Sequence, residues 1–324
     1  MRRERVVIIG SGPAGMAAAV YTGRAQLKPL VIVGNQLGGQ VSLTHEIENY
    51  PGFVDPLSGT ELVEQMKAQS ERFGAEFLWD SVTAADFSQR PFKISTYGEE
   101  ILTDSVIVTI GADPRKLNIP GEAEYVGRGV SYCGTCDGFF FRGKEVVVVG
   151  GGDSAFEEAL FLTRFATKVT MMYRAGQDKL RAGIQLQQRA LHNEKITMMY
   201  HTVVNEIKVG EHGSVNAVNI TDHAHGQTYD FKTDGIFIFV GHTPNSKVFG
   251  QQLAMDDSGY VITDERYRTS LEGVFAAGEI QDPIWKQVAT SVGQGTSAAM
   301  SAIHWLEENE HLLQSLDATV ETGA

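Results

Sequence analysis

Cysteine is scarce in this sequence of 324 residues: there are only two, and both lie in the stretch CGTCDG at 133–138. So few cysteines exclude a secreted domain held together by disulfides. The sequence also lacks any apolar run close to the roughly 18 residues needed to cross a bilayer. The apolar run after the basic start MRRER is too short for a signal peptide. These absences predict a soluble, cytoplasmic protein with no membrane partner.

Positive charge is in deficit, with 27 Lys and Arg against 40 Asp and Glu and a net charge of −13. This balance disfavours nucleic acid and anionic membranes as partners. The length is sufficient for two hydrophobic cores. The abundant residue is glycine, with 35 copies, and several of these glycines stand where β-branched runs end.

Two glycine-rich stretches repeat one pattern: VVIIGSGPAGMAAAV at 6–20 and VVVVGGGDSAFEEAL at 146–160. Each joins a β-branched run to a helical pattern through GxGxxG/A, the context that makes this motif a dinucleotide-binding fingerprint. The first glycine permits a tight turn, the second lets backbone N–H groups approach a pyrophosphate, and the small third residue lets helix and strand pack. The alternative for either copy is a turn without a ligand. The predicted binding residues are Gly10, Gly12, Pro13, Ala14 and Gly15 in the first copy, and Gly150, Gly152, Asp153, Ser154 and Ala155 in the second.

A residue that reads the ribose is expected at the end of the strand after each fingerprint. In the first copy Gly34 stands there, where Asp or Glu is usual; in the second, Tyr173 and Arg174 stand there. An arginine at this position favours a 2′-phosphate, and therefore NADP over NAD. The alternative is that Arg174 is a solvated surface residue.

The second fingerprint interrupts a set of glycines at strand ends. Gly111 precedes it and Gly278 follows it, and together they predict the walls of one extended flavin site. Segments rich in Pro, Gly and Asn predict the two points where the chain crosses between domains. We therefore expect an α/β fold with a discontinuous FAD-binding domain at 1–115 and 244–324 and an inserted NAD(P)H-binding-like domain at 116–243.

The last residues, WLEENEHLLQSLDATVETGA, carry a loose apolar stripe of Leu312, Leu316 and Val320 ahead of a polar end. The stripe predicts an amphipathic helix with a frayed tail. A tail that folds back over a site is the alternative.

The CxxC pair can in principle hold a metal, staple a turn or carry electrons. Zinc usually takes four ligands, and the sequence has no second CxxC and no histidines at ligand spacing, so no metal is expected. A bridge between Cys133 and Cys136 closes a tiny loop and stabilises little. Redox chemistry remains, because a CxxC dithiol at a helix start has a lowered thiol pKa and cycles readily. Asp137 can then give and take a proton, or it is an ordinary N-cap.

Seven motifs occur in a defined order: GSGPAG (10–15), GGQ (38–40), ENYPGF (48–53), CGTCDGFF (133–140), GGGDSAFEEALFL (150–162), FVGHTPN (239–245) and GVFAAGE (273–279). In this order and spacing the chain resembles the low-molecular-weight, bacterial-type thioredoxin reductases, which are class II pyridine nucleotide-disulfide oxidoreductases. The resemblance covers nearly the whole chain. It is specific because the CxxCD motif sits just before the second fingerprint.

The resemblance implies two Rossmann-like domains of the three-layer ββα type, a homodimer, and thioredoxin as the substrate. It implies FAD in the first domain, NADPH in the second, and Cys133 and Cys136 as the redox pair with Asp137 as acid. The implied FAD contacts are Gly10, Gly12, Pro13, Ala14, Gly15, Gly39, Gln40, Asn49, Gly111, Gly278, Glu279, Gln287 and Val288. The implied NADPH contacts are the second fingerprint with Arg174 and Arg181.

Three positions depart from the family pattern. The NADPH motif HRRxxxR corresponds here to YRAGQDKLR at 173–181, which lacks the second arginine and has two residues inserted. One lost charge-assisted contact costs about 1.5–3 kcal/mol, which weakens NADPH binding roughly 10- to 100-fold. Glu279 also replaces the usual Asp, and Lys286 the usual Arg. NADPH remains the expected donor through Arg174 and Arg181, with NADH and a ferredoxin as alternatives.

A different enzyme on the same scaffold is a ferredoxin–NADP reductase or diaphorase. Such enzymes need no CxxC, so the two cysteines favour a disulfide reductase. The net charge of −13 argues against an acidic ferredoxin as partner unless basic residues cluster locally.

Overall fold

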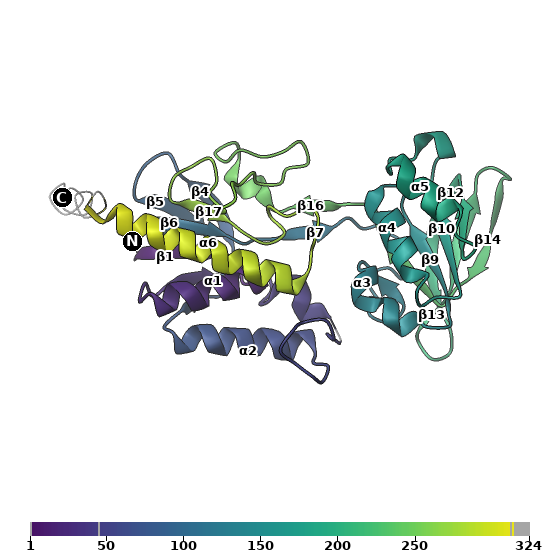
Figure 1. Ribbon diagram of the computed structural model, residues 1–324, viewed down its shortest axis with the longest axis horizontal. Helices are drawn as coiled ribbons and strands as arrows, with labels where there is room; N and C mark the ends of the chain where they lie inside the picture. The colour runs from purple at the N-terminus through teal and green to yellow at the C-terminus, as the bar shows by residue number, and fades with distance from the viewer. Residues whose placement is uncertain (1, 45, 312, 314–324) are drawn as a thin grey trace. The chain divides into compact units, whose positions relative to one another are not determined.

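The computed structural model describes residues 2–44, 46–311 and 313 (Figure 1). The chain divides into two compact units, one made of Met1–Asp113 with Thr243–Ala324 and the other of Pro114–His242. These boundaries lie one or two residues from the crossings expected from the sequence. The apolar stripe of Leu312, Leu316 and Val320 lies outside the described residues.

The discontinuous unit is built on a mainly parallel sheet with the order β3-β2-β1-β6, in which β17 lies beside the second half of β6. An antiparallel pair, β5 and β4, continues the sheet from the first half of β6. The strands are β1 (Arg2–Ile9), β2 (Leu30–Ile32), β3 (Glu76–Leu78), β4 (Val82–Asp86), β5 (Phe92–Thr96), β6 (Glu100–Val108) and β17 (Val274–Ala276).

Helices α1 (Pro13–Arg24) and α6 (Val288–Glu308) cover one face of this sheet, and α2 (Gly59–Arg72) packs beside α1 (Figure 1). Small residues let α1 and α6 approach closely, because a Cβ added at Gly295 would clash with the backbone carbonyl of Ala14. Helix α2 begins with a capping box, in which Ser58 and Glu61 exchange hydrogen bonds. Short 3₁₀ turns, η1 (Gly39–Leu43) and η4 (Ser246–Phe249), complete the unit.

The inserted unit has a five-stranded parallel sheet in the order β11-β10-β9-β15-β8 and a separate antiparallel sheet, β12-β13-β14. The two crossings between the units pair as β7 (Ala112–Pro114) and β16 (His242–Pro244). The strands of the inserted unit are β8 (Val130–Ser131), β9 (Glu145–Val149), β10 (Lys168–Met172), β11 (Ile196–Met199), β12 (Thr202–Val209), β13 (Val215–Asp222), β14 (Gln227–Lys232) and β15 (Gly235–Ile238). The helices are α3 (Gly134–Asp137), η2 (Gly138–Phe141), α4 (Asp153–Leu162), η3 (Gln177–Lys179) and α5 (Ile184–Leu191).

Strand β9 shows why the inserted unit has three layers. Side chains alternate across a strand, and Val146 and Val148 pack with Phe156 of α4 on one face. Val147 points to the other face and packs with Val218 of β13. The parallel sheet therefore lies between helices and an antiparallel sheet (Figure 1). This is the three-layer ββα arrangement, and it confirms the predicted fold class.

Candidate active site

The first fingerprint joins β1 to α1. At two of its three glycine positions there is no room for a Cβ atom. Gly10 has φ +110°, and a Cβ there would clash with the carbonyl of Thr109. A Cβ at Gly15 would clash with the carbonyl of Gly10 and would lie 2.8 Å from Oγ1 of Thr109. Gly12 differs, because nothing lies within 4 Å of a Cβ built there. The loop therefore leaves open the side that a pyrophosphate needs, at the N-terminus of α1.

The second fingerprint repeats this geometry between β9 and α4. Gly150 has φ +152°, and a Cβ there would clash with the carbonyl of Phe239. Ala155 is fully buried against Gly150, while nothing lies within 4 Å of a Cβ built at Gly152. The first and third positions are thus fixed by packing and the middle one is open. Both loops fit the phosphates of a dinucleotide.

Tyr173, at the position where a ribose-reading residue is expected, lies just after β10. The tyrosine ring lies against the backbone of Gly151, and its hydroxyl donates to the carbonyl of Lys179 at 2.7 Å. The Arg181 amide donates to the carbonyl of Gly151 at 2.9 Å, so the segment after β10 folds back onto the fingerprint. Arg174 and Arg181 are exposed, and neither guanidinium has an ion pair or side-chain hydrogen bond among the residues that the structure describes. The two predicted clamp residues are therefore accessible to a phosphate.

Several predicted flavin residues come together in the discontinuous unit. Asn49 donates to the side-chain oxygen of Gln287 at 3.2 Å, although the two are far apart in sequence. Gln40 donates to the carbonyl of Ala112, next to Gly111. A Cβ at Gly278 would lie 3.0 Å from that of Ala14, which places the Gly278 loop at the start of α1. Gly39 and Gly111 adopt positive φ with open space beside them, and Val288 begins α6.

Glu279 has an electrostatic environment that the sequence did not reveal. Burial raises the pKa of its carboxyl to about 7, and the charges of Asp282 and Asp113 add to the rise while Lys286 opposes it. The carboxyl is therefore substantially protonated near neutral pH. The sequence marked this position only as one with a longer side chain and did not reveal its raised pKa.

The cysteines form a disulfide at the start of α3, with Cα atoms 5.3 Å apart. Cys133 is the N-cap of α3, and its sulfur accepts the amide hydrogen of Cys136 at 3.2 Å. The hydroxyl of Thr135 lies 3.3 Å from the same sulfur. Asp137 closes α3, and its side chain does not cap the 3₁₀ turn that follows, so the alternative role as N-cap has no support there.

Glu122 is a residue that sequence reasoning missed. Its carboxylate is 2 % exposed and accepts amide hydrogens of Leu117 and Asn118 at 2.9 and 2.6 Å, and the hydroxyl of Tyr132 at 2.9 Å. Burial and this carboxylate raise the pKa of Tyr132, so its hydroxyl remains a donor. The cluster ties the first crossing to the residue before Cys133. No pattern in a single sequence marks an isolated glutamate as buried.

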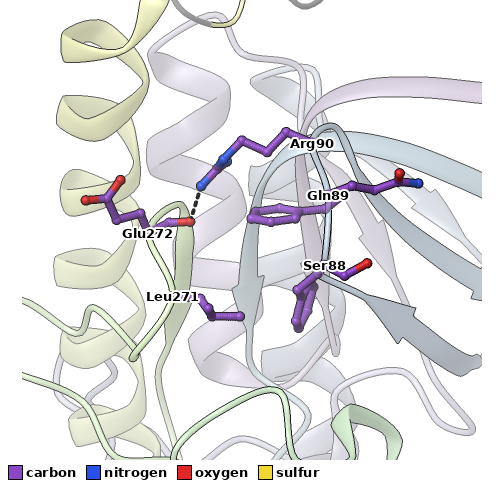
Figure 2. A pocket seen from close by; sticks show the side chains of 7 residues that line it. Ser88, Gln89, Arg90, Leu271 and Glu272 are labelled. Carbon is purple, nitrogen blue, oxygen red and sulfur yellow. Dashed lines mark hydrogen bonds between the residues drawn. The ribbon is translucent and has the colours of Figure 1, made fainter.

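A surface pocket of about 240 Å³, shown in Figure 2, lies apart from these residues. The guanidinium of Arg90 stacks on Phe92 and Trp305, with 4.4 and 4.7 Å to the ring centroids, and donates to the carbonyl of Glu272. Because Arg90 is already engaged by rings and backbone, it joins strands to α6 rather than offering a charge to a ligand. The pocket is lined by Phe87, Ser88, Gln89, Arg90, Phe92, Leu271 and Glu272, none of them a predicted site residue.

Two dinucleotide cradles, with a disulfide on one of the two units, define an oxidoreductase that passes electrons between a nucleotide and thiols. Residues 4–295 match the pyridine nucleotide-disulphide oxidoreductase family, and the chain belongs to that family.

The structure was also searched for membrane spans and metal sites. Among the described residues, none of the helices combines the length and the apolar character that a membrane span needs. No group of three or more His, Cys, Asp or Glu among these residues could hold a metal ion.

The chain is similar over almost its full length to proteins named thioredoxin reductase. It is 45% identical to the one from Bacillus subtilis over 96% of this chain and 97% of that protein. It is 47% identical to the one from Rickettsia conorii over 94% of this chain and 98% of that protein. The solved thioredoxin reductase of Giardia duodenalis is 40% identical with a TM-score of 0.89, over 95% of this chain and all of that one. The resemblance predicted from the motifs is confirmed.

Proposed function

We propose that this protein is a thioredoxin-disulfide reductase that passes electrons from NADPH, through FAD and the Cys133–Cys136 pair, to thioredoxin. The observation that carries the proposal is the disulfide at the start of α3, in the same unit as the second dinucleotide cradle. The relatives named thioredoxin reductase, matched over nearly the whole chain, support it.

The discontinuous unit is then the FAD-binding domain. The open backbone at Gly12 would hold the pyrophosphate, and the contacting pair of Asn49 and Gln287 would bind the flavin. The carboxyl of Glu279, whose pKa burial raises to about 7, would lie near the ribityl chain and in its neutral form could donate a hydrogen bond there. The inserted unit holds NADPH through Gly152 and the N-terminus of α4.

When bound, FAD supplies two-electron transfer between the pyridine nucleotide and the disulfide. The chain's own step is reduction of the Cys133–Cys136 bond, which takes two electrons and two protons to give two thiols. Asp137 is the proposed proton carrier for this pair, from its place at the end of α3. The thiols then reduce the disulfide of thioredoxin by exchange through a mixed disulfide.

Tyr173 favours a second candidate for the electron donor, NADH. The neutral ring at the ribose position supplies no charge for a 2′-phosphate, which leaves Arg174 and Arg181 to contact it. Arg174→Ala is expected to raise the KM for NADPH roughly 10-fold and leave that for NADH unchanged. Equal effects on both nucleotides, or none on either, would exclude Arg174 as a 2′-phosphate contact. Absence of flavin reduction by either nucleotide would leave a ferredoxin as donor.

The proposed function is tested by comparing disulfide reduction and dye reduction in a Cys136→Ser variant. We expect the variant to lose thioredoxin reduction and to keep NADPH-dependent reduction of a dye, because the dye takes electrons directly from the flavin. Cys133→Ser serves as the matched variant and should behave in the same way. A variant that still reduces thioredoxin at the wild-type rate would contradict the proposal. A homodimer and a cytoplasmic location remain predictions from the sequence.

A further inference from the structure

A carboxyl group lies against the turn that joins the two cysteines. It belongs to Glu158 on α4, whose Oε2 would be only 2.2 Å from a Cβ built on Gly134. Gly134 is buried and lies between Cys133 and Cys136 at the start of α3, and its lack of a side chain leaves room for this oxygen. The same oxygen is shielded from solvent. The redox pair therefore has beside it a titratable group that the proposed mechanism does not use.

The surroundings of Glu158 on α4 are apolar. Ala155 and Leu162, three residues before it and four residues after it, lie on the same face of the helix and are fully buried in the core of the inserted unit. The side chain of Leu162 also lies 3.1 Å from a Cβ built on Gly138, the first residue of η2. Because the effective dielectric constant is low in such surroundings, a charge on Glu158 acts strongly on its neighbours.

The other charged groups around α3 and α4 include one on the helix of the cysteines. On these helices and the elements packed against them, the charged residues are Asp137 on α3, Arg142 just after η2, Asp153 and the exposed Glu157 on α4, Glu145 and Lys168 at the first residues of β9 and β10, and the exposed Arg189 on α5. Asp137 has the same sign of charge as Glu158. Both carboxylates therefore oppose a thiolate on the redox pair.

We propose that the charge of Glu158 opposes a thiolate on the reduced pair and thereby makes Cys133–Cys136 a stronger reductant. Reduction of the disulfide takes two electrons and two protons and gives two neutral thiols. When a thiol then loses its proton to water, the carboxylate disfavours the new negative charge, whereas it leaves the neutral disulfide unaffected. The carboxylate therefore destabilises only the reduced form, and a less stable reduced form has a lower reduction potential.

This inference deepens the proposed function and rests on it for its biological meaning. A pair with a lower potential passes its two electrons more completely to the disulfide of thioredoxin. Glu158 forms no bond in this step and acts only through the cysteines, so it is a positioning residue. Two like charges about 8 Å apart at an effective dielectric constant of about 20 shift a pKa by between about one and two units.

The test is a redox titration of the full-length protein with bound FAD at several pH values. Mixtures of dithiothreitol and its cyclic disulfide equilibrate with the Cys133–Cys136 pair, and dithiothreitol supplies the two electrons and two protons. Acid then stops the exchange, the thiols are alkylated under denaturing conditions, and mass spectrometry measures the reduced fraction. The pH at which the slope of the potential changes gives the first thiol pKa.

Glu158→Gln removes the charge and keeps the size of the side chain. It should lower the first thiol pKa by about one unit. The potential should stay unchanged while both thiols are protonated and rise by about 30 mV once one thiolate is present, which corresponds to a tenfold change in the equilibrium constant. A merely structural change would shift the potential equally at every pH. Glu157→Gln, the exposed neighbour on the same helix, is the matched control and should change nothing.

Gly134→Ala is a second variant, which leaves Glu158 in the chain. The added methyl group would lie 2.2 Å from Oε2, so the carboxylate must move away from the turn. The potential should rise in the same pH range, by less than in Glu158→Gln. In the Glu158→Gln background the same change should add nothing, because no charge remains to be moved.

A Glu158→Gln potential that equals the wild-type value at every pH, that lies below it, or that shifts equally at every pH would overturn the inference. An effect of Gly134→Ala that persists in the Glu158→Gln background would also overturn it. If Glu158→Gln does not fold, the pH dependence of the Gly134→Ala shift decides in the same way. The titration needs neither NADPH nor thioredoxin. A failure of the proposed function, seen as no thioredoxin reduction by the wild type, is therefore distinguishable from a failure of the inference.

Discussion

One added methyl group should affect stability differently at two glycines of the first fingerprint, Gly12 and Gly15. At Gly12 the backbone has φ −66° and nothing lies within 4 Å of a Cβ, so alanine fits the protein without bound nucleotide. Alanine is a slightly weaker N-cap than glycine, which destabilises the folded state, but it also restricts the unfolded chain, which favours folding. Gly12→Ala therefore changes the free energy of unfolding by less than about 1 kcal/mol. At Gly15 the methyl meets the carbonyl of Gly10 and the hydroxyl of Thr109. Gly15→Ala should therefore cost at least about 1–3 kcal/mol.

Binding of FAD should show the reverse order of sensitivity. A methyl at Gly12 occupies the space that the pyrophosphate needs and removes at least one charge-assisted hydrogen bond, worth about 1.5–3 kcal/mol. The dissociation constant for FAD should then rise roughly 10- to 100-fold. Gly152→Ala is the matched variant in the second loop, where the space is equally open. It should leave FAD affinity unchanged and raise the KM for NADPH by a similar factor.

The assays are urea unfolding of the apoprotein and titration of the apoprotein with FAD, followed by flavin fluorescence. A Gly12→Ala variant that binds FAD within twofold of wild type would refute the assignment of the first loop. A Gly152→Ala variant with weaker FAD binding and normal NADPH kinetics would refute the assignment of the second. A strongly destabilised Gly12→Ala apoprotein would show that the space beside Gly12 is filled by other atoms of the protein even without FAD.

Three further predictions concern buried polar groups. The pKa of Glu279 is raised from 4.5 to about 7 in the folded protein, so the stabilisation from its protonated form is present below pH 4.5 and is lost as the pH rises to about 7. This loss amounts to about 3 kcal/mol in apoprotein unfolding, and it should be absent in Glu279→Gln. Tyr132→Phe should cost about 1.5–3 kcal/mol in urea unfolding by removing a donor from Glu122, whereas Tyr125→Phe, a neighbour in the same core, should be nearly neutral. Asp104 is 1 % exposed and pairs with two arginines of β1, so Asp104→Asn should destabilise by about 3 kcal/mol; no change in the urea midpoint would contradict this.

The fingerprints were predictable from sequence because their chemistry is local. A β-branched run, a tight glycine turn and a helix start are all encoded within fifteen residues. Gly10 has a positive φ, Gly12 has open space beside it and Gly15 makes a close packing contact. The continuous apolar run VVVVG is typical of a strand buried on both faces, as found for β9.

The electrostatic features could not be predicted, because they depend on contacts between distant segments. The pKa of Glu279 depends first on burial and then on the charges of Lys286, Asp282 and Asp113, and Asp113 lies about 170 positions earlier in the chain. The packing of Tyr173 on Gly151 needs the register between β9 and β10. The link from Glu122 to Tyr132 depends on a crossing segment that no sequence pattern marks.

The most direct test of the proposed electron path is anaerobic mixing of the FAD-loaded protein with NADPH, followed by thioredoxin. The visible absorbance of the flavin and the thiols formed on thioredoxin are measured in the wild type and in Cys136→Ser. NADPH is expected to bleach the flavin in both proteins, and only the wild type should form two thioredoxin thiols for each NADPH consumed. A flavin that NADPH does not reduce at up to about 1 mM, or a variant that forms thiols as the wild type does, would contradict the proposed path.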